Sequence, residues 1–261
     1  MKNFQTIKAE AEGRGVKVTL NRPEARNALN RVMISELTSA FEEIHRSEAR
    51  YLFLQGEGDF FCAGADIQWM RESKNYTYEE NYQDAEILVG LFEVILRCPL
   101  PVIAVVQGGA FGGALGLIAA SDIAIAEGSA KFSFSEVKLG LIPAVVSAFT
   151  IPKIGISAAR RLFLTSALFS AEEAKAVGLI HQVVSSTGAL KEAAAKVADE
   201  ILAGGPRAIR ETKRLLLDEY APLSERRVKN CVDAIAASRV GEEAQEGLSA
   251  FLEKRPPRWK K

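Results

Sequence analysis

Short apolar runs alternate with amphipathic segments along most of the chain. The runs are bounded by Gly, Pro or Asn, as is typical of buried strands. They lie at residues 4–10, 16–21, 51–55, 102–106, 123–126, 131–135 and 180–184. Apolar positions spaced three or four apart predict helices at 30–46, 81–97, 114–120 and 144–164, the last with a break at 152–155. A capping box that starts at Ser170 predicts a short helix, which Gly178 ends. Residues 74–82 are polar and are expected to form a mobile loop.

From residue 188 onward the pattern changes and predicts only helices. They are expected at 188–203, 206–219, 223–238 and 241–253. The chain therefore predicts an α/β protein, with a core over 1–190 and a C-terminal helical region over 191–261.

The stretch 102–126 holds a strand, a glycine-rich turn, a helix and a second strand. It lacks charge from 102 to 121, so a membrane helix is one interpretation, but its glycines and the prolines at 99 and 101 argue against it. A phosphate-binding loop is a second interpretation, although the lysine and hydroxyl of a P-loop are missing. The third is a site of backbone N–H donors, since the first N–H groups of a helix lack internal partners.

Composition excludes several classes of function. The 33 basic and 33 acidic residues cancel, which gives no indication of nucleic acid or membrane binding. Three widely spaced cysteines and two histidines argue against a disulfide scaffold and a metal site. The first ten residues lack the apolar core of a signal peptide, so a cytoplasmic protein is expected.

A second N–H donor is predicted in FCAGADI, residues 61–67. The strand 51–55 leads into this loop, and a helix starts near Asp66. Two strand–loop–helix units that lie side by side would direct the N–H groups of Ala65 and Gly113 at one spot. Such a pair stabilises a carbonyl oxygen that becomes an enolate.

At this point the chain resembles a known family. FCAGADI, GGAFGGALGL (108–117) and FSFSEVKLGLIP (132–143) occur in the order typical of the enoyl-CoA hydratase/isomerase, or crotonase, family. NRPEARNALN, SAEEAKAVGLI and FLEKRPP extend the resemblance over essentially the whole chain. The resemblance implies a spiral of ββα turns followed by helices, a homotrimer or hexamer, and a coenzyme A thioester as substrate with no other cofactor.

The resemblance also implies the residues that contact substrate. The oxyanion hole would be the N–H groups of Ala65 and Gly113, and the substrate and its CoA would lie along Arg26, Ala28, Ala63, Asp66, Ile67 and Gly112, with Phe251 and Lys254 near the phosphates, from the same subunit or a neighbour. Ordinary structural roles compete with these. Asp66 is also explained by the preference for a negative charge at a helix N-terminus. Arg26 is also explained as a surface arginine, and Lys254 as a solvated residue at the end of a helix. Trp69, Met70, Tyr76 and Tyr78 suit either an acyl pocket or ordinary packing.

The family's hydratases usually hold two catalytic glutamates, and this chain matches only one. Glu136 in FSFSEVKLG is the match, whereas Gly116 occupies the other position. A glutamate at 116, one helical turn beyond Gly113, would be expected to reach the same cavity. Glu136 alone must then both accept and return a proton, or a group of the substrate must help.

Three functions remain open on the sequence. Residues 135–149 resemble bacterial hydratases of branched, methylglutaconyl-type CoA esters, which favours hydration. Gly116 favours a double-bond isomerase, because moving a proton between two carbons needs one base. A CoA-ester-binding protein with little catalysis is the third, but a pure binder would not need Glu136.

Overall fold

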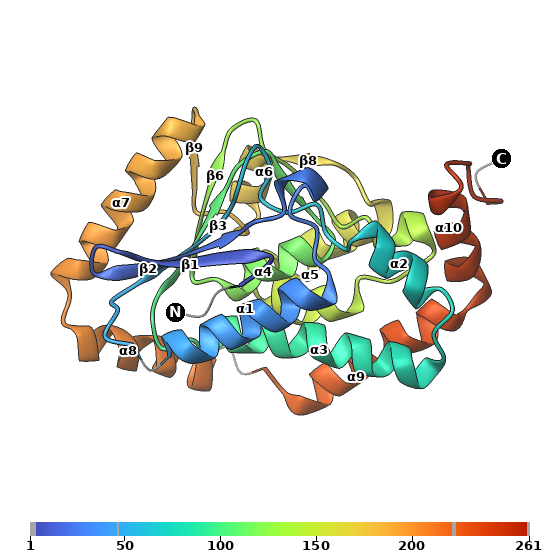
Figure 1. The fold of residues 1–261 in the computed structure, drawn as a ribbon, viewed down its shortest axis with the longest axis horizontal. Coiled ribbons are helices and arrows are strands. Elements are labelled where there is room, and N and C mark those ends of the chain that lie inside the picture. Colours follow the sequence, from blue (N-terminus) through green and yellow to red (C-terminus); the bar gives the residue numbers. More distant parts are fainter. Residues whose placement is uncertain (1–3, 46, 221–222, 260–261) are drawn as a thin grey trace.

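A computed structural model describes residues 4–45, 47–220 and 223–259 (Figure 1). Its main sheet has six strands in the order β1-β2-β3-β4-β6-β9. β1 and β2 form an antiparallel hairpin, and every later neighbour pairs in parallel. The strands are β1 (Ile7–Glu12), β2 (Gly15–Leu20), β3 (Leu52–Gly56), β4 (Val102–Val106), β6 (Ile123–Glu127) and β9 (Gln182–Val184).

Helices cover both faces of this sheet, which explains why its central strands are apolar throughout. In β4, Ile103 and Val105 pack under α7, while Val102, Ala104 and Val106 join the larger core on the opposite face. The helices are α1 (Arg31–Ile44), α2 (Ile67–Ser73), α3 (Tyr78–Leu96), α4 (Gly113–Ala120), α5 (Ala144–Thr165), α6 (Ala171–Ala176), α7 (Thr187–Ala203), α8 (Pro206–Leu215), α9 (Glu225–Val240) and α10 (Glu242–Leu252). Among the described residues, none of these helices is long and apolar enough to cross a membrane.

A second, three-stranded sheet was only partly predicted. It contains β5 (Gly109–Phe111), β7 (Lys131–Ser133) and β8 (Phe169–Ser170), in that order. The sequence pattern predicts that Gly109 lies in the glycine-rich turn after the strand 102–106. Its lack of a side chain instead lets β5 approach β7, since a Cβ at Gly109 would overlap the carbonyl oxygen of Lys131.

Helix α3 begins earlier than its apolar periodicity indicates. The Thr77 hydroxyl accepts a bond from the Glu80 N–H, and the Glu80 carboxylate accepts from the Thr77 N–H, so the two form a capping box. The helix therefore starts at Tyr78 rather than near Asn81. Residues 78–82, expected to be loop, are its first turn.

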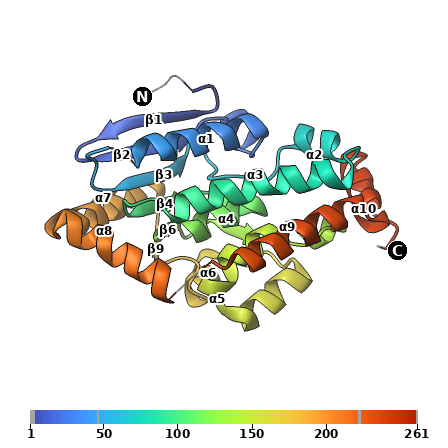
Figure 2. The same ribbon diagram turned by 90° about the horizontal axis from the view of Figure 1, so that it is seen from below.

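Helices α9 and α10 run along the core toward the end of the molecule that carries α2 (Figure 2). Helix α9 packs against α3 and α5, and α10 packs against α2 and the short 3-10 helix η2 (Glu136–Leu139). Two glycines allow this last contact: a Cβ at Gly140 would overlap Glu243, and a Cβ at Gly247 would overlap Leu139. The helical region thus supports the segment that carries Glu136.

Candidate active site

The backbone N–H groups of Ala65 and Gly113, which have no acceptor among the described residues, lie at the carboxyl edge of the main sheet. β3 and β4 are adjacent and parallel, so the loops that follow them emerge side by side. Leu29 donates to the Gly64 carbonyl and accepts from the Asp66 N–H, which leaves the Ala65 N–H directed away from Leu29. Gly113 is the first residue of α4. Within the described ranges, neither the Ala65 nor the Gly113 N–H has a hydrogen-bond partner.

Gly64 brings these two donor loops together. Its φ of 93° is rare for residues with a side chain. A Cβ at Gly64 would lie only 2.6 Å from the Phe111 carbonyl oxygen and 3.9 Å from the Gly112 nitrogen. Close backbone contact between the loops therefore requires glycine at this position.

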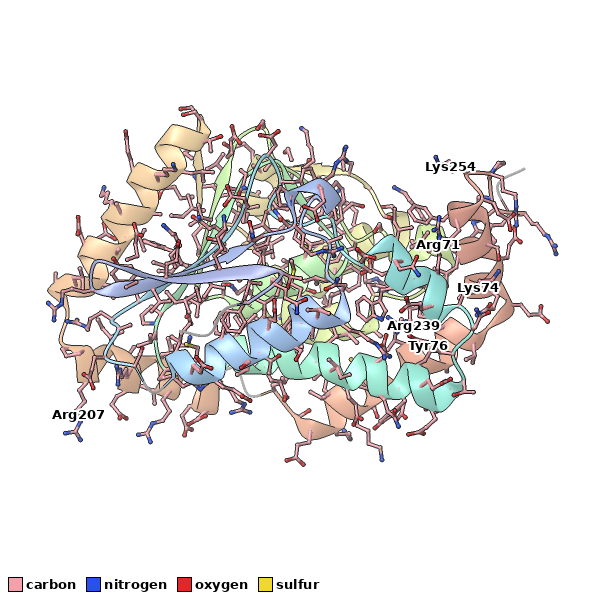
Figure 3. All side chains as sticks on the ribbon, viewed as in Figure 1. Arg71, Lys74, Tyr76, Arg207, Arg239 and Lys254 are labelled. Carbon is pink, nitrogen blue, oxygen red and sulfur yellow. The ribbon has the colours of Figure 1, made fainter. Side chains whose placement is uncertain are left out.

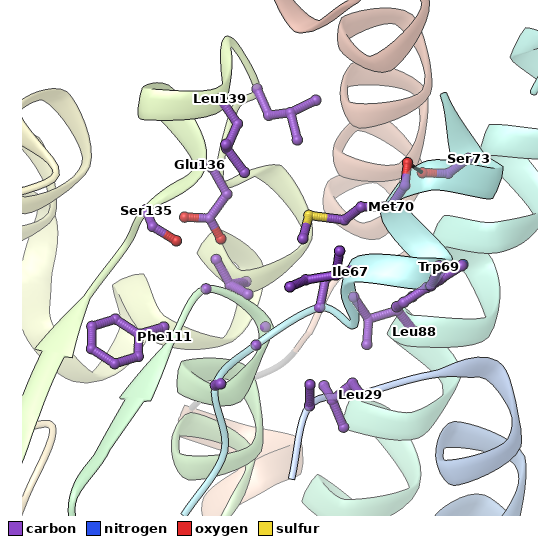
Figure 4. A pocket seen from close by; sticks show the side chains of 18 of the residues that line it. Leu29, Ile67, Trp69, Met70, Ser73, Leu88, Phe111, Ser135, Glu136 and Leu139 are labelled. Carbon is purple, nitrogen blue, oxygen red and sulfur yellow. Dashed lines mark hydrogen bonds between the residues drawn. The ribbon is translucent and has the colours of Figure 1, made fainter. Parts of the chain in front are cut away.

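Both donor loops line a cavity of about 700 Å³. Its walls also include η2, α2 and residues of α3, α9 and α10. Figure 4 shows Phe111, Ser135 and Glu136 on one side of the cavity, with Trp69, Ser73 and Leu88 on the opposite side and Met70 between. Trp69 and Met70 thus line the cavity, whereas Tyr76 and Tyr78 are not among its lining residues.

Glu136 points its carboxylate toward the Gly112 turn. A Cβ at Gly112 would lie 3.3 Å from Glu136 Oε1, which places the carboxylate beside the helix start that presents the Gly113 N–H. As a whole residue Glu136 is only half-buried, but its Oε2 atom is hidden from solvent and has no partner among the described residues. Burial raises the pKa of Glu136 to about 7, opposed only by its own backbone N–H.

Most of the predicted substrate-binding residues line this cavity. Arg26, Ala28, Ala63, Ile67, Gly112 and Phe251 do so together with the three predicted catalytic positions, Ala65, Gly113 and Glu136. The Arg26 guanidinium lies 5.7 Å from the centre of the Phe60 ring, which is also in the cavity wall. Phe251 belongs to α10 of the same chain.

Asp66 and Lys254 are not part of the cavity wall. The Asp66 carboxylate accepts from the N–H groups of Gln68 and Trp69 at the start of α2 and forms a 2.9 Å ion pair with Arg22. These contacts fit the helix-terminal role rather than a direct substrate contact. Lys254 is exposed just after α10, and Figure 3 labels it at that end of the molecule.

Gly116 differs from what the sequence led us to expect. It is buried in α4, outside the cavity wall, and a Cβ there would overlap the ring of Phe92. The expectation that a glutamate at 116 would reach the cavity is therefore wrong. Phe92, packed edge-on against Phe149 with ring centres 5.2 Å apart, occupies the space that such a side chain would need.

We expect Gly116→Glu to destabilise the fold without adding a working carboxylate. Overpacking a core costs about 1–3 kcal/mol, and a buried charge adds to this cost. Thermal unfolding measures the loss. The double variant Gly116→Glu with Phe92→Ala, which removes the obstructing ring, should be less impaired than additivity predicts. An unchanged melting temperature for the single variant would contradict the packing described here.

A buried ionic cluster was not predicted from the sequence. Asp84 of α3, whose side chain is fully buried, accepts from Arg239 Nη1 at 3.0 Å, from Arg31 and from the Trp69 indole. Arg239 lines the cavity, and burial lowers its pKa while Asp84 opposes the shift. One sequence signal could have indicated this cluster. Asp84 is an acidic residue on the apolar face of its helix, where a buried carboxylate needs a basic partner.

Across the described ranges, no three histidine, cysteine, aspartate or glutamate side chains lie close enough together to hold a metal ion.

The sequence of this chain is similar to a described family of proteins. The sequence family described as enoyl-CoA hydratase/isomerase matches residues 11–261. A crotonyl-CoA hydratase from Syntrophomonas wolfei is 32% identical over 97% of this chain and 96% of its own length.

The similarity to known proteins extends to the fold of solved structures. An enoyl-CoA hydratase from Shewanella pealeana is 40% identical, with a TM-score of 0.79 over 98% of this chain and 96% of that one. An enoyl-CoA hydratase from Mycobacterium avium is 30% identical, with a TM-score of 0.88 over 98% and 99%. The predicted crotonase-type α/β fold is confirmed. The chain belongs to the enoyl-CoA hydratase/isomerase family.

Proposed function

We propose that this chain hydrates the double bond of a 2-enoyl-CoA thioester whose acyl group is branched, of the methylglutaconyl type. The observation that carries the proposal is the Glu136 carboxylate beside the Gly113 helix start, whose Oε2 is hidden from solvent and has no partner in the described part of the chain. The substrate belongs to the family's class, and the branching rests on the resemblance of residues 135–149.

The proposed reaction uses one carboxylate twice. The ionised Glu136 takes a proton from water, and the resulting hydroxide attacks Cβ of the double bond. The electron pair moves to the thioester oxygen, which the Ala65 and Gly113 N–H groups hold as an enolate. When the carbonyl re-forms, the protonated Glu136 delivers its proton to Cα, so one water is added and the base is restored.

The raised pKa suits this double role. A group with a pKa near the working pH is both an adequate base and an adequate acid. Glu136 and Glu24 are the two carboxylates in the described cavity wall, and Glu24 is exposed. Phe92 leaves no space for a second carboxylate at position 116. A single glutamate therefore carries both proton transfers in this proposal.

Substrate binding is proposed to follow the cavity. The CoA portion lies along Arg26, Ala28, Ala63 and Ile67, with Phe251 and Lys254 near its phosphates. Asp66 supports this wall by capping α2 and pairing with Arg22. The reaction is redox-neutral and uses no cofactor beyond the CoA of the substrate. We also propose the homotrimer or hexamer implied by the family resemblance, which analytical ultracentrifugation would test.

Double-bond isomerisation is the second candidate. Glu136 would remove a proton from Cα of a 3-enoyl ester and return it to Cγ, through a dienolate whose oxygen the Ala65 and Gly113 N–H groups would hold. The presence of one carboxylate favours this reaction. Relatives that are called hydratases favour hydration.

Labelled water distinguishes the two reactions. The enzyme is incubated in ¹⁸O-water with a panel of 2-enoyl and 3-enoyl CoA esters, straight and branched, and products are followed by mass. Hydration predicts one ¹⁸O per product, with a branched ester turned over fastest. Interconversion of 2-enoyl and 3-enoyl esters without label in any product would replace hydration by isomerisation.

The pH profile should report the buried glutamate. Because Glu136 must start ionised, kcat/KM is expected to rise about tenfold per pH unit below its pKa of about 7 and to level off above it. Initial rates between pH 5 and 9 measure this. A flat profile over that range would show that Glu136 is not the base.

A further inference from the structure

The residue before Glu136 carries a hydroxyl that approaches the same part of the cavity. Ser135 lines the cavity, and Figure 4 shows its side chain beside the Glu136 carboxylate. A Cβ at Gly112 would lie 3.7 Å from Ser135 Oγ and 3.3 Å from Glu136 Oε1. The two oxygens therefore converge on one small space, on the side of the turn where Gly112 has no side chain.

Backbone pairing holds Ser135 at this place. Ser133, the last residue of β7, pairs with Phe111 of β5, and its carbonyl accepts from the Gly112 N–H at 3.0 Å. Two residues later, Ser135 has helical backbone angles (φ −85°, ψ −1°) at the start of η2. The second sheet thus fixes the position of Ser135 beside the glycine turn, without help from the serine side chain.

The Ser135 hydroxyl is not used by the fold. It makes no capping bond to η2, and no other hydrogen bond of this hydroxyl is found within the described ranges. It is also not among the hidden side-chain atoms that lack a partner, so the oxygen remains accessible in a residue that lines the cavity. A hydroxyl in this situation is available to bind water.

Other polar side chains of the wall are less suited to hold a water molecule beside Glu136. Lys138 also lines the cavity, but an ammonium group donates hydrogen bonds and accepts none. Ser73 lies on the opposite side and donates to the Met70 carbonyl at 3.1 Å. A water molecule beside Gly112 would have the Glu136 carboxylate and the Ser135 hydroxyl as partners, and two polar partners are the minimum for a bound water.

We propose that Ser135 is a catalytic residue that holds the attacking water together with Glu136. The water donates one O–H to Glu136 Oε1 and the other to Ser135 Oγ, which directs a lone pair of its oxygen at Cβ of the substrate. Glu136 takes the first proton as the new C–O bond forms, and Ser135 keeps its own proton throughout. The product keeps the second water proton in its hydroxyl group.

A neutral hydroxyl suits this role beside a single carboxylate. A second carboxylate would repel the ionised Glu136 and raise its pKa further, whereas serine accepts from water without adding charge. This inference rests on the proposed hydration. It adds the group that takes the place of the second glutamate in orienting the water.

Ser135→Ala tests the proposal through two rates. The first is ¹⁸O uptake from labelled water into the 2-enoyl-CoA ester that the parent hydrates fastest. It should fall about tenfold, because one hydrogen bond in the transition state is lost. The second is exchange of the Cα hydrogens of butanoyl-CoA in D₂O, which needs Glu136 and the N–H donors but no attacking water. It should stay near the parent's rate in Ser135→Ala and be lost in Glu136→Gln.

Ser147→Ala is the matched control. The Ser147 hydroxyl donates to the Ala144 carbonyl at 2.6 Å and lies outside the cavity wall, so both rates should stay as in the parent. Circular dichroism checks that each variant folds. If Ser135→Ala does not fold, Ser135→Cys decides, because a thiol fills a similar space but is a weak hydrogen-bonding group. This variant should also lose ¹⁸O uptake and keep the exchange.

The possible failures of this inference and of the proposed function differ. Equal ¹⁸O uptake by the parent and the Ser135 variants would overturn the role of Ser135 and leave hydration standing. A parallel fall of uptake and exchange would also overturn it, because Ser135 would then act through the placement of Glu136. Absence of ¹⁸O uptake by the parent from every ester would refute hydration itself, and the role of Ser135 with it.

Discussion

Glu136→Gln is expected to lower turnover by about 10²–10⁴-fold, the usual contribution of a general base. Gln keeps the size of the side chain but cannot take a proton from water. Affinity for an unreactive CoA ester should hardly change, because the predicted CoA contacts lie elsewhere in the wall. Steady-state kinetics and calorimetry measure the two effects. Activity close to that of the parent would remove Glu136 from the mechanism.

The same variant should be more stable than the parent at neutral and higher pH. The Glu136 pKa rises from an ordinary 4.5 to about 7 on folding, so the folded chain binds more protons between these values. The free energy of unfolding therefore falls as pH rises through this window, by about 3 kcal/mol in total. Because a glutamine side chain does not titrate, the free energy of unfolding of the variant does not fall in this way. Parent and variant should have similar stability at pH 4 and differ most above pH 7.

Gly113→Pro is expected to lower turnover by roughly 10²–10³-fold, because it deletes one N–H donor of the oxyanion hole. The fold should tolerate the change. Gly113 is the first residue of α4, a position that proline suits, and its N–H has no partner in the described part of the chain.

Gly113→Ala is the matched control. It keeps the N–H and adds a Cβ at 3.5 Å from Leu29 Cδ1, which is ordinary contact. Its activity should stay near that of the parent, while the proline variant loses activity. Equal loss in both would indicate crowding rather than donor removal, and a folded, active proline variant would exclude Gly113 from the site.

The central part of the site was predictable because it depends on local sequence signals. Glycine at 64 and the apolar strands before each loop fix where the Ala65 and Gly113 N–H groups lie. The parallel pairing of β3 and β4 then brings the groups to one edge. Each of the two strand–loop–helix units spans only about twenty residues, so its pattern can be recognised locally.

The parts that could not be predicted depend on contacts between distant segments. The sequence shows a glycine at 116 but not the Phe92 ring that fills the space beside it. The sequence does not show that Arg239 pairs with Asp84 and lies beside the Trp69 ring, because both residues precede it by more than 150 positions. The family resemblance implies that Asp66 contacts the substrate, but its carboxylate caps α2 and pairs with Arg22.

The contact of α10 with η2 has a consequence for refolding. Gly140 meets Glu243, roughly a hundred residues further along the chain, so this part of the site is a contact of very long sequence separation. Such contacts form late, because the chain between them must first lose its freedom. Until α10 docks, η2 lacks this support, and the Glu136 side chain that η2 carries is not yet held beside the Gly112 turn. During refolding from denaturant, helical circular dichroism should therefore recover before catalytic activity does.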